Sequence, residues 1–197
     1  MKKGQIVEGT VKRVAFPNKG ITEIPGEKKS VLVKNVIPGQ KIRVSINKIR
    51  KNHVEGKLLE VVEKASEEIV PSCPHFGVCG GCTYQNLSYE QQLKIKAAQV
   101  KEMMDLAVCG DYIWEGISPS PVTNGYRNKM EFTFGDEVKD GPMSLGMHKR
   151  GGFYDVVSTL NCKIVDEDYR KILKCTLKAA TDSGMPYYHR VRHTGFF

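Results

Sequence analysis

Short runs of alternating apolar and polar residues, separated by Pro and Gly breaks, fill residues 5–63 and restrict the fold of this chain more than any other feature. Period-two alternation indicates strands with one buried face, and Pro, Gly and Asn clusters favour turns. Five short strands in such a segment favour a small antiparallel barrel, because closure removes exposed edge strands. The clearest strand candidates are residues 6–13, 31–33, 41–46 and 58–62, and the breaks fall at residues 17–20, 25–27, 38–39 and 52–53.

The charge of the chain is concentrated in the same segment. Residues 1–64 hold 15 Lys plus Arg against 6 Asp plus Glu, a net charge of +9, whereas residues 65–197 hold 15 against 16, a net charge of −1. This asymmetry predicts a basic domain at residues 1–64 followed by a near-neutral domain at residues 65–197. A basic domain suits a polyanionic partner, and the alternative interpretation is a Lys-rich solvated face.

Basic side chains alternate with apolar ones along the predicted strands, which would give the barrel one basic outer face suited to a phosphate backbone. We therefore predict a five-stranded barrel of the oligonucleotide-binding (OB) type. Phe16 is its one aromatic residue, so base stacking is poorly supported and the barrel should grip backbone more than it reads bases. The candidate contacts on the strands are Lys12, Arg13, Lys41 and Arg43.

Three cysteines, Cys73, Cys79 and Cys82, lie within ten residues at the spacing C-x5-C-x2-C, with glycines between them. Six cysteines in 197 residues are too few for a disulfide scaffold, and clustered cysteines in a reducing compartment more often bind a metal or do redox chemistry. Soft thiolates are ligands for zinc or an iron–sulfur cluster, and glycines let backbone N–H groups reach the sulfurs. The alternative is three thiols without a ligand role.

A fourth ligand is required, and the spacing leaves His75, Cys109, Cys162 and Cys175 open as candidates. Cys175 lies in a helical run and is expected in the core, and Cys109 ends a helix. Cys162 lies in a polar connection after a strand, where a ligand can be presented, which favours it.

The rest of the chain predicts an α+β domain with a small antiparallel sheet. A capping-box sequence at residues 88–91 precedes an apolar stripe that predicts a helix packed on the core. A second helix is expected from about Asp166 to Asp182. The strand candidates are residues 126–134 and a hairpin formed by residues 143–147 and 153–157.

The turn of that hairpin carries His148, Lys149 and Arg150, for which a catalytic role, a solvated turn and a phosphate contact all remain open. The chain has no dinucleotide fingerprint, Walker loop, nucleophile elbow or zinc-protease helix, and we assign it no catalytic residue. No apolar run approaches the length of a membrane helix, and no signal peptide follows Met1. We expect a cytoplasmic, monomeric protein without a membrane partner.

Several separate blocks of the sequence resemble the SAM-dependent RNA (uracil-5-)-methyltransferases, especially those that act on 23S rRNA. The blocks occur in the order of the family along essentially the whole chain. They are the cysteine loop with Tyr84 and Gln85, residues 126–129, residues 145–150, and the isolated Cys162. The resemblance implies that the basic barrel is a TRAM domain, an RNA-binding module, and that the partner is 23S rRNA.

The resemblance further implies that Cys73, Cys79, Cys82 and Cys162 hold a [4Fe-4S] cluster in a domain that helps to bind and fold the RNA. We expect the cluster to be structural, because it would tie the cysteine loop to a residue about 80 positions later, as a metal staple does in folding. Cys109 and Cys175 receive no role. The residues implied to face RNA are Tyr126, Arg127, Asn128, Lys129, His148, Lys149 and Arg150.

Methyltransferases of this family carry a further C-terminal domain that binds SAM and supplies the nucleophilic cysteine and the general base. The sequence contains no match to that domain, so we expect SAM to bind only through it and this chain alone to be inactive, as a fragment or a naturally shortened relative. The function predicted is RNA binding and positioning for uridine C5 methylation. The alternative is a stand-alone RNA-binding module with zinc or a redox-sensing iron–sulfur cluster and no catalysis.

Overall fold

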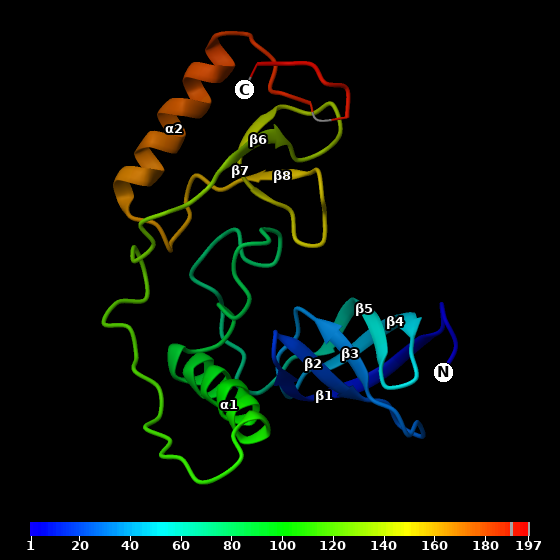
Figure 1. Cartoon of the computed structure of the whole chain (residues 1–197). Helices are drawn as coiled ribbons and strands as arrows, with labels where there is room; N and C mark the ends of the chain where they lie inside the picture. Colours follow the sequence, from blue (N-terminus) through cyan, green and yellow to red (C-terminus); the bar gives the residue numbers. More distant parts are fainter. Residues whose placement is uncertain (190, 197) are drawn as a thin grey trace. The chain divides into compact units, whose positions relative to one another are not determined.

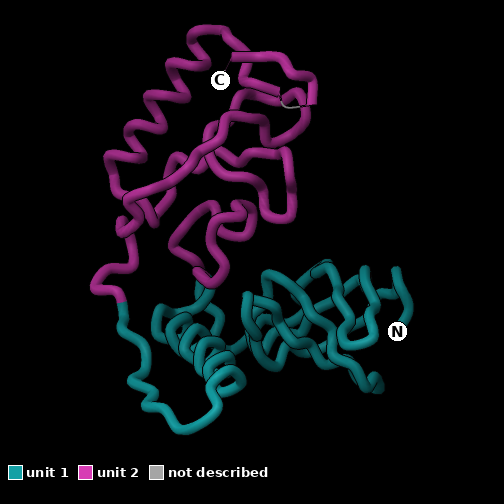
Figure 2. The backbone as a smooth tube through the Cα atoms, in the orientation of Figure 1, with its two compact units in different colours: residues 1–70, 86–119 teal, residues 71–85, 120–197 magenta. Residues whose placement is uncertain are grey.

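A computed structural model of the chain describes residues 1–189 and 191–196 (Figure 1). The chain forms two compact units that interleave along the sequence (Figure 2). Unit 1 comprises Met1–Val70 and Asn86–Pro119, and unit 2 comprises Pro71–Gln85 and Ser120–Phe197. The helix after the cysteine loop therefore groups with the barrel, which differs from the single boundary after residue 64 that the charge pattern indicates.

Unit 1 contains a closed barrel of five strands in the order β1-β2-β3-β5-β4. Neighbouring strands pair antiparallel except β3 and β5, which pair parallel. This arrangement confirms the five-stranded barrel predicted from the alternation pattern. The strands are β1 (Ile6–Ala15), β2 (Lys19–Glu23), β3 (Val31–Lys34), β4 (Lys41–Ile49) and β5 (Val54–Glu63).

The apolar interior of the barrel is filled by inward-facing residues of β1, β3, β4 and β5 and of the connections between strands. Most of them are β-branched, and their side chains pack well on a pleated surface. Gly56 of β5 is needed for this packing, because a Cβ there would lie 2.2 Å from Cγ1 of Val44. The buried cluster comprises Val11, Ile24, Val31, Val33, Val36, Ile42, Val44, Ile46 and Val54.

Helix α1 (Tyr89–Ala107) lies against the barrel through polar contacts. Ser88 caps its first turn, as predicted, by accepting a hydrogen bond from the Gln91 N–H at 3.3 Å. Gln99 is buried and donates to the Val14 carbonyl at 3.2 Å. The expected apolar stripe is largely exposed instead, at Val100 and Met104 among others, because the helix turns its Gln99 face to the barrel.

Unit 2 holds a three-stranded antiparallel sheet in the order β6-β7-β8, which confirms the predicted small sheet. The predicted strand at residues 126–134 is paired in the sheet only at its end, because residues 126–132 run outside it. Asp166 caps the last helix by accepting from the N–H groups of Asp168 and Tyr169, as predicted. The elements are β6 (Thr133–Asp136), β7 (Met143–His148), β8 (Val156–Ser158) and α2 (Glu167–Asp182).

Neither helix in the described part of the chain combines the length and the hydrophobicity that a membrane crossing requires.

Candidate functional site

The four cysteines predicted as ligands line one cavity of unit 2. Cys73, Cys79 and Cys82 come from the loop before α1, and Cys162 comes from the connection between β8 and α2. Residues about 80 positions apart therefore meet at one place. Among residues 1–189 and 191–196, no three His, Cys, Asp or Glu side chains form a group that could hold a metal ion as they stand. The other residues lining the cavity are His75, Phe76, Gly81, Met130, Met147, Thr159 and Ile164.

Backbone hydrogen bonds join the cysteine loop to the turn after β7. The Gly80 N–H donates to the His148 carbonyl at 2.9 Å, and the Arg150 N–H donates to the Val78 carbonyl at 2.6 Å. A Cβ on Gly80 would lie 3.0 Å from the His148 carbonyl oxygen, so glycine permits this close approach. The loop is thereby fixed to the sheet with its cysteines facing the cavity.

Two of the sulfurs accept hydrogen bonds from nearby N–H groups. The Gly81 N–H lies 3.3 Å from Sγ of Cys79, and Nε2 of Gln85 lies 3.1 Å from Sγ of Cys82. The first contact confirms that a glycine of this loop directs its N–H to a sulfur. The pKa values of the Cys79 and Cys82 thiols are raised. Burial is the largest cause and the neighbouring cysteines add to it, whereas the two hydrogen bonds oppose it. A bound cation would reverse this balance, because it deprotonates a coordinating thiol.

Two buried polar atoms at the cavity have no hydrogen-bond partner within the described residues. They are Nε2 of His75 and Oγ1 of Thr159, both on residues that line the cavity. A buried polar group without a partner costs about 1–3 kcal/mol and calls for an explanation such as a bound ion or group. The chemistry of the cavity is therefore that of four thiols, an apolar wall and two unsatisfied polar atoms.

The side chain of Arg150 contacts the cysteine loop. Its Nη2 donates to the Cys82 carbonyl, and its guanidinium lies 4.8 Å from the centroid of the Phe76 ring. The charge also acts on the Cys79 and Cys82 sulfurs, whose anionic forms it stabilises. The role for Arg150 that this geometry supports is to hold the loop and balance negative charge on the sulfurs; the RNA contact implied by the family resemblance stays a prediction.

Replacing Arg150 by methionine should lower the free energy of unfolding by about 1–2 kcal/mol, because it removes one charge-assisted hydrogen bond and one cation–π contact. Thermal unfolding followed by circular dichroism measures the change. Lys149→Met is the matched control, since no hydrogen bond or ion pair of the Lys149 side chain is found within the described residues, and only its backbone N–H and carbonyl are bonded, to the Asp155 carbonyl and the Gly152 N–H. Equal losses in the two variants would contradict the assignment.

The other candidates for the fourth ligand occupy different positions. His75 lines the cavity, whereas Cys109 and Cys175 are exposed and free and do not line it. The expectation that Cys175 lies in the core is wrong, because α2 buries Leu173 and Ala180 and turns Cys175 to solvent.

The four strand residues predicted to contact RNA are all engaged in ion pairs. Each pairs with a carboxylate of a neighbouring element, at distances of 2.6 to 3.5 Å for the pairs Lys12–Glu23, Arg13–Glu102, Lys41–Glu63 and Arg43–Glu8. Arg43 also contacts Glu60. The hydrogen bonds that Lys41 donates to Glu63 and Arg43 donates to Glu8 raise the pKa of Lys41 and Arg43, respectively. The predicted basic face is therefore charge-compensated.

Residues 126–129 are exposed, as contacts to RNA would require. The segment is held at the Arg127 N–H, which donates to the Ile164 carbonyl at 2.9 Å, and at the Asn128 carbonyl, which accepts from the Tyr169 hydroxyl. Lys129 lies 3.2 Å from Glu131. The backbone is thus fixed next to the Cys162 connection, and the side chains of Tyr126 and Asn128 face outward.

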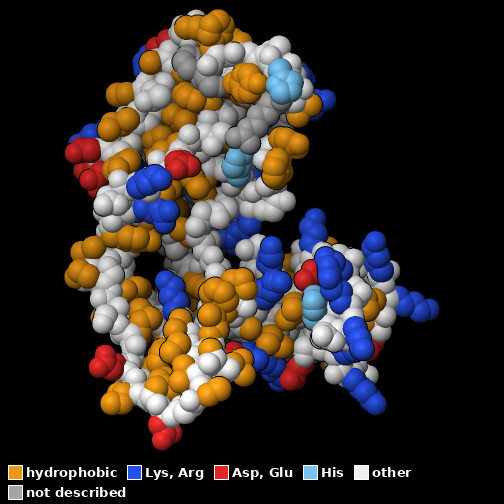
Figure 3. Space-filling model, in the orientation of Figure 1, with side chains coloured by type: hydrophobic (Ala, Val, Ile, Leu, Met, Phe, Trp, Pro, Cys, Tyr) orange, Lys and Arg blue, Asp and Glu red, His pale blue; other side chains and the backbone are white. Residues whose placement is uncertain are grey.

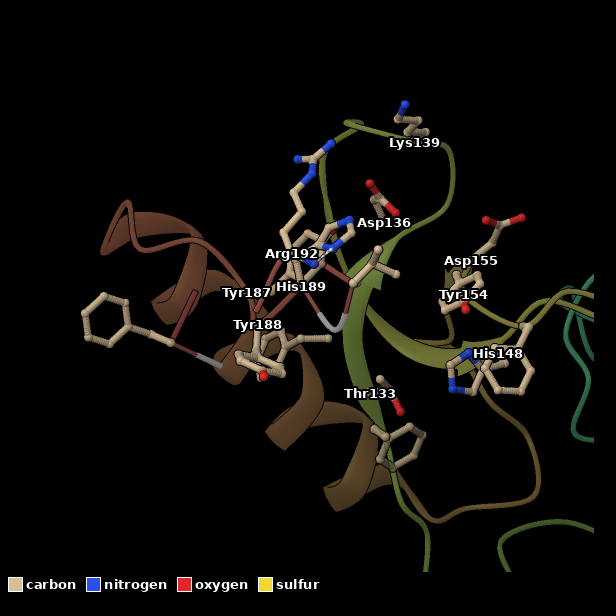
Figure 4. A pocket seen from close by; sticks show the side chains of 16 residues that line it. Thr133, Asp136, Lys139, His148, Tyr154, Asp155, Tyr187, Tyr188, His189 and Arg192 are labelled. Atoms are coloured by element: carbon tan, nitrogen blue, oxygen red, sulfur yellow. Dashed lines mark hydrogen bonds between the residues drawn. The ribbon is translucent and has the colours of Figure 1, made fainter. Parts of the chain in front are cut away.

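His148 lies at a second cavity of unit 2, with a volume of about 860 Å³ and many aromatic side chains. Figure 4 shows Tyr187, Tyr188 and His189 on one side of β6 and His148 and Tyr154 on the other. Aromatic rings of this kind can stack on planar ligands such as unpaired bases. His148 and Arg150, which are two positions apart, therefore lie at two different places: His148 at this cavity and Arg150 against the cysteine loop.

The fold and the sites define a class of protein in which a basic five-stranded barrel accompanies an α+β unit with a four-cysteine cavity. The chain is similar over its whole length to an uncharacterized RNA methyltransferase of Caldanaerobacter subterraneus, at 43% identity over 196 residues. Relatives described in the same words from Clostridium tetani and Clostridium acetobutylicum are 42% and 39% identical. The chain spans 43%, 42% and 42% of the length of these three relatives. No family model matches it.

Proposed function

We propose that this chain is the RNA-binding and iron–sulfur portion of a SAM-dependent 23S rRNA (uracil-5-)-methyltransferase, acting as a cytoplasmic monomer. The observation that carries the proposal is the similarity to RNA methyltransferases along the whole chain. The barrel, as a TRAM domain, would grip the RNA backbone, and unit 2 would position the uridine for C5 methylation. The proposal places the SAM site, the nucleophile and the general base on none of the residues of this chain.

The residues of the cysteine cavity fit a [4Fe-4S] cluster. Cys73, Cys79, Cys82 and Cys162 would hold it, since four thiolates are its usual ligand set. Each cysteine of a cluster binds a different iron, so the sulfurs need only line a common cavity, as these four do. Gln85 and Gly81 would donate hydrogen bonds to sulfur, which tunes such a centre. The cluster would supply a cross-link between distant parts of unit 2.

RNA binding tests the proposal directly. The chain, purified without oxygen, should bind a structured 23S rRNA fragment with an affinity that falls steeply with salt, because Lys and Arg release counterions from phosphates. With six or more phosphate contacts, the affinity should fall by about 10³-fold between 50 and 200 mM salt. Filter binding across a salt series measures it. Absence of binding at low salt, or an affinity that salt does not change, would contradict the proposal.

The competing function is a metal-binding module without a role in methylation, supported by the fact that four thiols also form a zinc ligand set. Metal analysis separates the two. Iron, acid-labile sulfide and broad visible absorbance favour the cluster, whereas a colourless protein with one zinc per chain favours the alternative.

A further inference from the structure

One end of the barrel carries cations that no carboxylate neutralises in the described part of the chain. The connection between β2 and β3 holds Lys28 and Lys29, and the turn between β4 and β5 holds Arg50 and Lys51. All four are exposed, and no ion pair of theirs is found among the described residues. We call these four residues the loop cations.

The two loops lie side by side. Nζ of Lys29 donates to the Lys51 carbonyl at 3.1 Å, which joins the β2–β3 connection to the β4–β5 turn. Figure 1 shows both at the same end of the barrel. Lys and Arg side chains project from the barrel on the face visible in Figure 3. The charges therefore form one surface although they come from positions more than 20 residues apart in the sequence.

The carboxylates near this end are already compensated. Glu23, which lines one pocket with Lys28 and Lys29, pairs with Lys12 at 3.5 Å. Glu27 accepts from the amino group of Met1 at 3.0 Å. Glu55 is approached by Lys19 at 3.6 Å and by His53 at 3.3 Å, and the charges of Lys19, Lys48 and His53 lower its pKa against the opposing effect of burial. The electrostatic potential at this end of the barrel is therefore positive.

The strand cations, defined here as Arg13, Lys41 and Arg43, form weaker phosphate contacts. Each must exchange its carboxylate for the phosphate, so it gains one ion pair and loses another. An unpaired cation gains the phosphate without that loss and releases the counterion condensed on the nucleic acid. Phosphate binding at the loop cations is therefore favoured over binding at the strand cations.

We propose that the loop cations Lys28, Lys29, Arg50 and Lys51 form the surface on which the barrel binds the RNA phosphate backbone. The inference rests on the proposed function for the identity of the polyanion as RNA. The barrel end carries no aromatic side chain, so it binds backbone and leaves the sequence of the RNA to be read elsewhere.

Two charge-matched variants of the full chain test the proposal. The loop variant is Lys28→Gln, Arg50→Gln and Lys51→Gln, and the strand variant is Arg13→Gln, Lys41→Gln and Arg43→Gln. Each loses three positive charges from exposed or partly exposed positions, and circular dichroism verifies that both remain folded. Affinity for a structured 23S rRNA fragment is measured from 50 to 300 mM salt.

The loop variant should lose affinity by on the order of 100-fold at 0.1 M salt and lower the log–log salt slope by about 2 to 3, whereas the strand variant should change affinity less than about threefold. Equal losses would show that only net charge matters, and a larger loss in the strand variant would place the surface on the strands. Either result overturns the inference. RNA binding absent from the unsubstituted chain would refute the proposed function instead.

The last measurement is binding of the chain to vesicles of phosphatidylcholine and phosphatidylserine. We expect the unsubstituted chain to bind them much more weakly than it binds RNA at equal salt. Vesicle binding that depends on the loop cations, together with RNA binding that does not, would identify a membrane surface as the partner and overturn the inference.

Discussion

Cys79→Ser should abolish the iron and sulfide of the proposed cluster and lower the stability of the protein by about 4 kcal/mol. The reason is topological. The proposed cluster, held by Cys79 and Cys162 among others, would close a loop of more than 80 residues, and a cross-link of that size contributes about 4 kcal/mol by restricting the unfolded chain. For a chain of this length, the melting temperature should fall by about 8 °C or more. Iron, sulfide and visible absorbance are measured beside thermal unfolding.

Cys175→Ser and Cys109→Ser are the matched controls for this substitution. Both cysteines are free and exposed and neither lines the cavity, so both variants should keep the metal content and the melting temperature of the parent. A Cys79→Ser protein with normal stability would refute the structural role and leave a redox role. Loss of iron from the Cys175→Ser protein would show that the ligand set is wrong.

The barrel could be predicted because residues alternate between buried and partly exposed along stretches such as β4 and because Pro and Gly breaks separate these stretches, but the sequence did not reveal one strand. Strand β2 begins at Lys19 and Gly20, which are typical of a turn after Pro17. Gly20 is a strand residue for a reason of packing, since a Cβ there would lie 2.2 Å from Cγ2 of Val36. Such a close approach depends on the closed barrel, so the local sequence cannot reveal it.

The convergence of Cys162 with the cysteine loop could be predicted, since a polar connection after a strand can present a ligand. The contacts around these cysteines could not be predicted. Arg150 is a basic residue in a glycine-rich turn, and its sequence context does not show that it contacts a loop nearly 70 residues earlier. The pairing of Lys41 with Glu63 likewise depends on the register of β4 with β5, which the charge pattern does not specify.

Ile42→Ala should destabilise the barrel by about 2–5 kcal/mol, because the substitution removes a fully buried side chain from the centre of its core. The free energy of unfolding falls by about 1–3 kcal/mol per molar urea, so the midpoint of barrel unfolding should move to lower urea by about 1 M or more. Hydrogen exchange of barrel amides follows this transition, and visible absorbance follows the proposed cluster.

Ile6→Ala makes the same change in side chain at a position of β1 that is 59% exposed, and it should alter stability by less than about 0.5 kcal/mol. Because the core around Ile42 and the cysteine cavity belong to different compact units, the Ile42→Ala protein should lose barrel protection at urea concentrations where visible absorbance is unchanged. Equal shifts in both signals would mean that the units unfold together, and equal effects of the two substitutions would contradict the packing of the barrel interior.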